Sequence, residues 1–129
     1  MINTADSEQV FIGLLHGGNW LAKKYFKARA KQAEKLLPAI EKMLQATSYK
    51  LQAISVVSGP ASFTALRIGV VTANTLAWSL QVPIVSFKLT EFENLDELAR
   101  LVSAKVKSGR SEVIVKPFYG SQPNITKKI

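Results

Sequence analysis

The chain has 129 residues, which is enough for one compact domain with its own hydrophobic core. Apolar residues make up 47% and charged residues 20%, which excludes a disordered chain, and no apolar run approaches the ~20 residues of a membrane-spanning helix. The absence of cysteine and the single histidine exclude disulfides, thiolate metal sites and multi-histidine sites. Because the first residues also lack the pattern of a signal peptide, we expect a cytoplasmic protein with no metal, no cofactor and no membrane contact.

The charge is strongly basic. Lys and Arg total 17 against 9 Asp and Glu, which gives a formal net charge of +8. Such an excess favours association with polyanions such as nucleic acid. Much of it lies in residues 23–50, where only Glu34 and Glu41 oppose it. A solvated basic face and a nucleic-acid contact both explain this stretch.

Two strands joined by a turn come first in the chain. Residues 10–15 form an apolar run of strand length, His16 to Asn19 form a turn, and residues 20–26 alternate well enough to return as a second strand. We expect an antiparallel hairpin, with only residues 2–5 ahead of it for a further strand.

Two helices and two strands follow. Apolar residues recur at helical spacing over 33–47, where Pro38 either kinks the helix or marks its first turn. Residues 51–57 predict a buried strand, residues 64–80 a second helix and residues 82–87 another short strand.

A capped helix and a last strand complete the pattern. We expect Asn94 to be the N-cap of a third helix and Glu97 to complete a capping box, with Ser108-Gly109 ending the helix. Residues 112–118 fit a final strand, and a basic tail begins at about 119. This order predicts an α/β protein with a mixed sheet flanked by helices, in a single domain spanning 1–129.

The second predicted helix has almost no polar face. A helix that is apolar all round is buried on more than one side, and a chain this short has few elements to cover the second side. Ala65, Gly69 and Ala73 form a ridge of small residues four apart, although Gly69 costs ~1 kcal/mol relative to Ala in a helix. Either the first helix of the same chain fills this groove, or the groove is an interface to a second subunit.

The loop that enters this helix is a candidate phosphate loop, because small residues are followed by helix amides. It lacks the Gly-Lys-Ser/Thr ending of a P-loop, so a tight turn capped by a side chain explains it equally well. Its residues are Gly59, Pro60, Ser62, Thr64 and Arg67. No catalytic residues are predicted, since His16 has no paired nucleophile and the acidic residues near 91–97 suit a helix start.

A family resemblance rests mainly on one segment. Residues 58–70 have the sequence SGPASFTALRIGV and strongly resemble the GPGSFTGLRIG signature of the TsaB (YeaZ) family. Ala61 and Ala65 replace two of its glycines. Residues 32–38, QAEKLLP, resemble the family's HSExLLP helix, which accounts for the proline inside a helical pattern.

Both ends of the chain add to this resemblance. Ile2 to Ala5 lies where the family has Ile-Asp-Thr-Ser, with Asn3 in place of the aspartate. Residues 116–126 resemble the family's closing PxYxxxPxIT segment. The resemblance implies an actin-like, RNase-H-like fold, normally built as two such lobes, of which this chain has a single lobe and lacks most of the second.

The resemblance also implies a function. Family members do not catalyse the transfer themselves; they pair, through their first two helices, with the TsaD-type catalytic subunit that makes threonylcarbamoyladenosine on ANN-decoding tRNA. A TsaE-type ATPase joins the assembly, and tRNA is met through the complex. We therefore expect a non-catalytic scaffold subunit, which in isolation is a candidate homodimer. The residues expected to line its partner interface are Leu36, Leu37, Ile40, Met43, Ala65, Gly69, Thr72 and Ala73.

Two other functions remain open from the residues. A small actin-like nucleotide-binding enzyme would use Asn3, Thr4 and the 59–64 loop for phosphate, although Asn3 removes a carboxylate that holds Mg²⁺ or orients water. A direct tRNA-binding module would use the basic stretch and would show a steep salt dependence.

Overall fold

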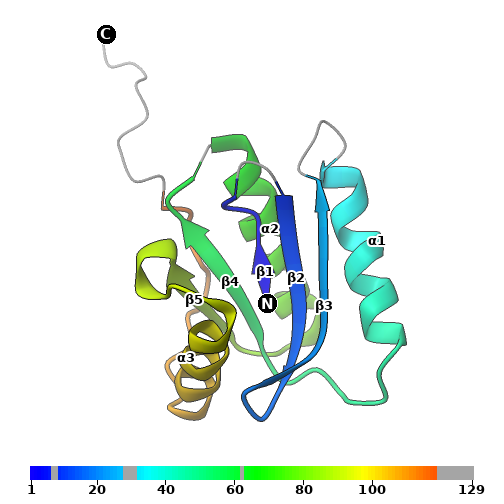
Figure 1. The fold of residues 1–129 in the computed structure, drawn as a ribbon, viewed down its shortest axis with the longest axis vertical. Helices are drawn as coiled ribbons and strands as arrows, with labels where there is room; N and C mark the ends of the chain where they lie inside the picture. The colour runs from blue at the N-terminus through cyan, green and yellow to red at the C-terminus, as the bar shows by residue number, and fades with distance from the viewer. Residues whose placement is uncertain (7–8, 28–31, 62, 119–129) are drawn as a thin grey trace, which may run out of the picture.

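A mixed five-stranded sheet organises the chain, as predicted (Figure 1). The computed structural model describes residues 1–6, 9–27, 32–61 and 63–118. The strand order is β3-β2-β1-β4-β5, in which β1–β2 and β2–β3 are antiparallel and β1–β4 and β4–β5 are parallel. The strands are β1 (Ile2–Asn3), β2 (Gln9–His16), β3 (Asn19–Lys27), β4 (Ile54–Gly59) and β5 (Ile84–Lys88).

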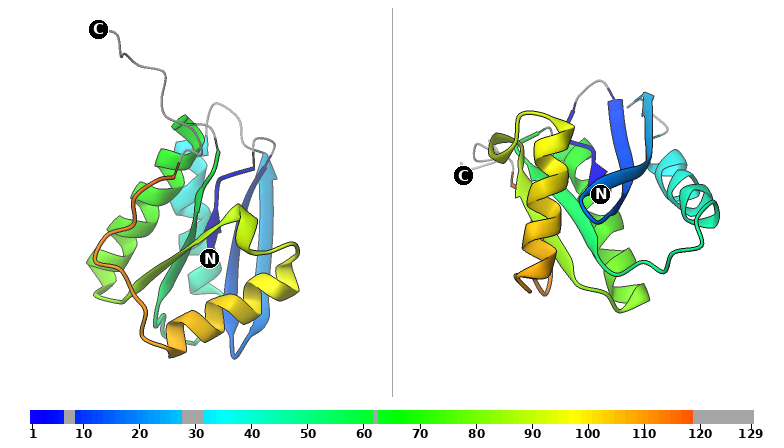
Figure 2. Two further views of the ribbon diagram at one scale, coloured as in Figure 1. Left: turned by 90° about the vertical axis from the view of Figure 1, so that its left-hand side faces the viewer. Right: turned by 60° about the horizontal axis from the view of Figure 1, so that its bottom comes forward.

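Helices cover both faces of the sheet. One face carries α1 (Gln32–Gln45) and α2 (Phe63–Leu80), and the other carries α3 (Leu95–Lys107), which follows the short 3-10 helix η1 (Leu89–Glu91) (Figure 2). Since α1 begins at Gln32, Pro38 lies inside the helix and does not mark its start.

Strand alternation divides the interior into two cores, because successive side chains point to opposite faces of the sheet. The larger core lies between the sheet and the α1–α2 pair and includes Val10, Ile12, Leu36, Leu66 and Val70. The smaller core lies under α3 and includes Val85, Phe87, Leu98 and Val102.

The β2–β3 hairpin is tied to α3 through Trp20. Gly13 leaves room for the indole, since a Cβ at that position would come within 2.8 Å of the Trp20 ring carbon Cε3. The indole Nε1 donates a hydrogen bond to the Leu95 carbonyl at 3.1 Å, and the ring of Phe11 packs edge-on against it at 5.3 Å. The hairpin and the first turn of α3 are therefore held together across the smaller core.

Of the two hydrogen bonds predicted for the capping box of α3, the structure contains the one accepted by Asn94. Asn94 Oδ1 accepts a hydrogen bond from the Glu97 backbone N–H at 2.8 Å, as expected of an N-cap. The Glu97 carboxylate accepts from the backbone N–H of Glu93 at 2.7 Å, one residue before the capping-box position.

The predicted final strand over 112–118 is wrong. Only Glu112 forms a bridge, to Ile84 of β5, and no strand of the described residues continues from it. At Val115, the backbone forms its hydrogen bonds with the side chain of Asn74 on α2 and not with a neighbouring strand. Its Nδ2 donates to the Val115 carbonyl, and its Oδ1 accepts from the Val115 N–H, both at 2.8 Å. A helix side chain thus satisfies the backbone of Val115, whose own side chain is buried.

Replacing Asn74 with Ala should lower the free energy of unfolding by about 2 kcal/mol, because two backbone groups at a buried residue lose their partners. Urea unfolding measures this change, and hydrogen exchange should show faster exchange at Val115 than elsewhere. Thr75→Ala, at the adjacent exposed position of α2, serves as the control and should change stability by less than about 0.5 kcal/mol. Equal effects of the two substitutions would contradict the conclusion that the Asn74 side chain stabilises the backbone of Val115.

Candidate functional site

The predicted phosphate loop lies where the parallel strands β1 and β4 end, at the upper edge of the sheet in Figure 1. Ligands of open α/β sheets commonly bind outside the carboxyl ends of the strands. In this chain, however, the backbone of Phe118 lies against the loop. The Phe118 N–H donates to the Ser58 carbonyl at 2.7 Å, and a Cβ on Gly59 would overlap the Phe118 carbonyl oxygen. Gly59 has a φ of +133°, so glycine is required there by backbone conformation and by space.

The remaining loop residues differ in exposure. Pro60 is half-buried, while Thr64 and Arg67 are exposed on the first turns of α2. Ser62 lies outside the described residues. The structure therefore gives the loop its predicted position between β4 and α2, and a phosphate site there remains a prediction.

The side chains of Asn3 and Thr4, at the end of β1, contact other residues of the same chain. Asn3 Oδ1 accepts a hydrogen bond from the Ala5 N–H at 2.9 Å, which forms a local turn. The Thr4 side chain is fully buried, and its Oγ1 has no hydrogen-bond partner among the described residues. It faces Gly69, because a Cβ on Gly69 would overlap Thr4 Oγ1 and would lie 2.8 Å from Thr4 Cγ2.

The eight predicted interface residues divide between core and surface. The helices α1 and α2 are in contact on the same face of the sheet, which corresponds to the intrachain alternative for the groove. Four residues are buried in the chain: Leu36, Ile40, Gly69 and Ala73. The other four keep part of their surface in solvent: Leu37, Met43, Ala65 and Thr72. Gly69 thus allows α2 to approach Thr4 closely, and a partner interface over the eight residues remains a prediction.

The predicted interface residues do not include the apolar side chains that α2 exposes most. Trp78 is 83% exposed and Val71 is 58% exposed, and their spacing of two helical turns places them on one face. Asn74 lies between them and binds Val115, so Ile114, which is 59% exposed, borders the same face. We call Val71, Trp78 and Ile114 the α2 patch. Exposed apolar side chains that gather on one face are typical of a protein interaction site.

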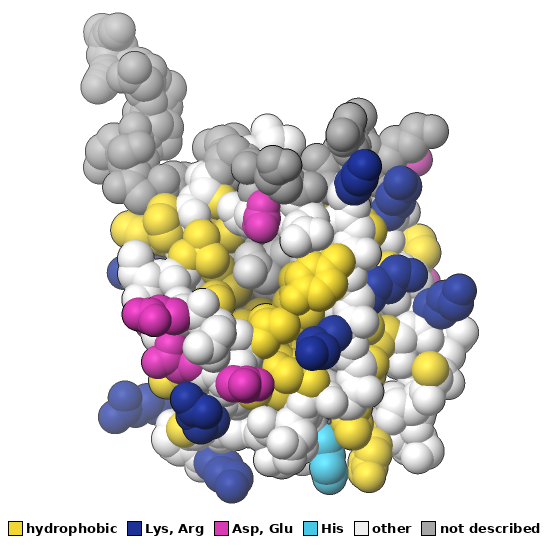
Figure 3. Space-filling view, in the orientation of Figure 1, with side chains coloured by type: hydrophobic (Ala, Val, Ile, Leu, Met, Phe, Trp, Pro, Cys, Tyr) yellow, Lys and Arg dark blue, Asp and Glu magenta, His cyan; other side chains and the backbone are white. Residues whose placement is uncertain are grey.

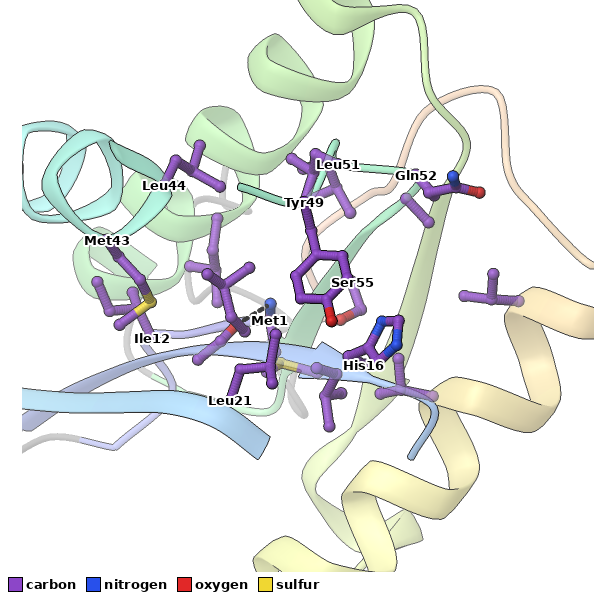
Figure 4. A pocket seen from close by; sticks show the side chains of 18 of the residues that line it. Met1, Ile12, His16, Leu21, Met43, Leu44, Tyr49, Leu51, Gln52 and Ser55 are labelled. Atoms are coloured by element: carbon purple, nitrogen blue, oxygen red, sulfur yellow. Dashed lines mark hydrogen bonds between the residues drawn. The ribbon is translucent and has the colours of Figure 1, made fainter. Parts of the chain in front are cut away.

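A cavity of about 530 Å³ lies at the other end of the sheet, beside Met1 (Figure 4). Its walls come from β2, from the end of α1, from residues 49–55 and from α3. The Met1 amino group donates to the Gly13 carbonyl at 2.9 Å beside the cavity, and burial lowers the pKa of this amino group from 8.0 to about 5. At the rim, the rings of His16 and Tyr49 stack at 4.4 Å.

Charge is distributed unevenly on the face shown in Figure 3. Basic side chains lie along the β3 side, where Lys23, Lys24 and Lys27 are all exposed, and acidic side chains gather toward η1 and the start of α3. Within the described residues, no three acidic or histidine side chains are placed to hold a metal ion, and no helix has the length and apolarity to cross a membrane.

Taken together, the sheet order, the helices on both faces and the turn from β4 into α2 define an actin-like, RNase-H-like α/β protein. The family model of TsaD, described as tRNA N6-adenosine threonylcarbamoyltransferase, matches residues 27–106. The chain belongs to this family, on its TsaB (YeaZ) side.

Individual relatives agree with this assignment. The chain is 36% identical over 76 residues to the tRNA threonylcarbamoyladenosine biosynthesis protein TsaB of Bacillus subtilis strain 168, a match that covers 57% of this chain and 33% of the relative. YeaZ from Pseudomonas aeruginosa and a crystal structure described as similar to peptidase YeaZ from that organism each superpose with a TM-score of 0.60 at 29% identity. Each covers 67% of this chain and 41% of the solved chain. The chain thus spans about a third of the length of TsaB from Bacillus subtilis.

Proposed function

We propose that this chain takes part in threonylcarbamoyladenosine modification of tRNA as a non-catalytic scaffold subunit that binds a TsaD-type catalytic subunit. The proposal rests on membership of the family and on the name of its relative from Bacillus subtilis, a tRNA threonylcarbamoyladenosine biosynthesis protein. The observation that carries the binding role is the α2 patch, where an indole is 83% exposed on a helix. An exposed tryptophan beside other apolar side chains is typical of an interface hot spot.

The proposed partner surface is the solvent side of α1 and α2. It includes Leu37 of α1, which is 44% exposed, Thr72 of α2 and the α2 patch. Leu36, Ile40, Gly69 and Ala73 support this surface from below, since they pack in the larger core or against Thr4. A TsaE-type ATPase and tRNA are proposed to join through the catalytic subunit.

A non-catalytic role agrees with the residues at the carboxyl ends of β1 and β4. Asn3 stands where the family resemblance has an aspartate, and its side-chain oxygen already accepts from Ala5. The strand ends at Gly59 are approached by the backbone of Phe118. These contacts favour a structural use of this edge over phosphate binding.

Replacing Trp78 with Glu should weaken association with the TsaD-type subunit of the same organism by about tenfold or more, because an interfacial aromatic anchor becomes a charge. Co-expression followed by size-exclusion chromatography with light scattering gives the stoichiometry, and titration calorimetry gives the dissociation constant. The fold should survive, since the indole is mostly in solvent.

Tyr25→Glu is the matched control for this experiment. Tyr25 is an aromatic residue that is 49% exposed on β3, and it contacts Phe11 on the α3 side of the sheet. We expect this variant to bind the partner normally. If the wild-type chain fails to bind the TsaD-type subunit, the scaffold function is rejected. If both variants weaken binding equally, the proposed surface is rejected.

A further inference from the structure

On the α3 side of the sheet, the β2–β3 hairpin presents an aromatic ring to solvent. Tyr25 of β3 lies opposite Phe11 of β2, and the centroids of their rings are 5.0 Å apart. Phe11 in turn packs edge-on against Trp20, whose indole Nε1 donates to the Leu95 carbonyl of α3. Phe11 is buried, whereas Tyr25 is 49% exposed. Phe11 and Trp20 thus support the Tyr25 ring at the surface from below.

Two lysines flank this ring on the same face of the sheet. Side chains two residues apart on a strand point to the same side, so Lys23 and Lys27 share the side of Tyr25. A rise of ~3.3 Å per residue separates the two lysine positions by about 13 Å, with the ring halfway between them. Both lysines are exposed, and within the described residues neither is paired with a carboxylate. We call Lys23, Tyr25 and Lys27 the β3 platform.

Acidic side chains limit this basic surface on one side. They gather toward η1 and the start of α3, whereas basic side chains lie along β3 (Figure 3). Trp20 contacts Leu95, the first residue of α3, so it lies between Tyr25 and the acidic start of that helix. A polyanion is therefore attracted to the β3 side of the Tyr25 ring and repelled from the α3 side.

An exposed aromatic ring between two lysines suits the chemistry of single-stranded nucleic acid. The bases of a single strand stack on aromatic side chains, and its phosphates are neutralised by lysine or arginine. In a duplex the bases are already stacked on one another, so a duplex would use the lysines without the ring. A polyanion that has no bases would also use the lysines alone.

We propose that the β3 platform binds single-stranded RNA, with one base stacked on Tyr25 and the neighbouring phosphates held by Lys23 and Lys27. This contact goes beyond the proposed function, in which tRNA joins through the catalytic subunit. Only the choice of RNA over DNA rests on that function. The platform lies on the α3 side of the sheet, and the α2 patch lies on a helix that covers the other side. The chain can therefore hold RNA and a protein partner at the same time.

Fluorescence anisotropy with 5′-labelled hexauridylate, at a series of salt concentrations, tests the site. We expect saturable one-to-one binding by the wild-type chain. Tyr25→Ala should weaken it about tenfold, because a stacked base loses its ring, and should leave the slope of log K against log salt unchanged. Lys27→Ala should weaken binding and reduce that slope by about 0.7, because one phosphate contact is lost.

Inorganic polyphosphate, titrated by calorimetry, is the matched ligand without bases. Lys27→Ala should weaken its binding, whereas Tyr25→Ala should bind it as the wild type does, which also shows that this variant is folded. Absence of saturable hexauridylate binding by the wild-type chain would overturn the proposal. Equal hexauridylate affinities of Tyr25→Ala and the wild type would overturn it as well, because the lysines would then be a general polyanion surface.

Three further variants locate the binding within the protein. Tyr25→Phe keeps the ring and should bind hexauridylate as the wild type does. Lys42→Ala removes the same charge from an exposed position of α1, on the other side of the sheet, and should change the affinity by less than about twofold. Trp78→Glu should still bind hexauridylate, and Tyr25→Ala should still bind the TsaD-type subunit. A chain that binds RNA but not that subunit would reject the scaffold function alone, whereas loss of RNA binding by Trp78→Glu would reject the β3 platform.

Discussion

Acidification from pH 8 to pH 5 should lower the free energy of unfolding by up to about 4 kcal/mol through the Met1 amino group alone, at ~1.4 kcal/mol for each unit of pKa difference. Burial lowers the pKa of this amino group from 8.0 to about 5 in the folded protein. Between these values the unfolded chain binds a proton that the folded chain does not, so falling pH favours unfolding. Below pH 5 both forms are protonated and this contribution stops changing.

Urea unfolding at a series of pH values measures this dependence, and acetylation of the amino terminus supplies the control. The acetylated chain cannot take up the proton, so its stability should lack this contribution between pH 5 and pH 8. The other titratable side chains that line the cavity are His16, Tyr49, Lys50 and Lys107. They are present in both forms and cancel in the comparison. Parallel pH profiles for the free and acetylated chains would show that the amino group is not buried in this way.

Replacing Gly69 with Val should lower the free energy of unfolding by about 3 kcal/mol or more, at the upper end of what overpacking costs. The added Cβ would overlap Thr4 Oγ1, and it would lie 2.8 Å from Thr4 Cγ2. Thr4 is fully buried and directly follows β1. Relieving the overlap would therefore require α2 or the end of β1 to shift within the core. The overlap outweighs the gain of ~1 kcal/mol that Gly69→Ala would otherwise bring to a helix interior.

A double-mutant cycle separates this contact from a general effect on the helix. Thr4→Ala removes Oγ1 and Cγ2, the two atoms that would lie nearest the new side chain, and leaves Thr4 Cβ at 3.0 Å. Adding Gly69→Ala to the Thr4→Ala protein should therefore change stability less than adding Gly69→Ala to the wild type. Thermal unfolding by circular dichroism measures all four proteins. Additive effects within about 0.5 kcal/mol would mean that Gly69 and Thr4 do not interact.

Local patterns predicted most of the secondary structure. The strand β2 and the helices α1, α2 and α3 follow from apolar periodicity, and Asn94 is the N-cap expected from its residue type. The family resemblance of residues 58–70 led to the fold class, because that segment spans the turn from β4 into α2. These features depend on residues that are neighbours in sequence, which is why they can be predicted without a structure.

The errors concern contacts between distant residues. Residues 112–118 have the composition of a strand, but the backbone of Val115 pairs with the side chain of Asn74, 41 residues away. Gly69 indicated a close approach correctly, yet nothing in the helix pattern identified Thr4 as the group approached.

The lysines of β3 have a consequence for how copies of this protein behave in concentrated solution. β3 is an edge of the sheet, and Lys23, Lys24 and Lys27 are exposed along it. Edge strands that carry several positive charges repel the same strand of another molecule, which prevents sheets from joining edge to edge into aggregates. At the opposite edge, Glu112 bridges to Ile84 of β5 and covers part of that strand. Lys23, Lys24 and Lys27 thus protect this edge of the sheet against edge-to-edge aggregation.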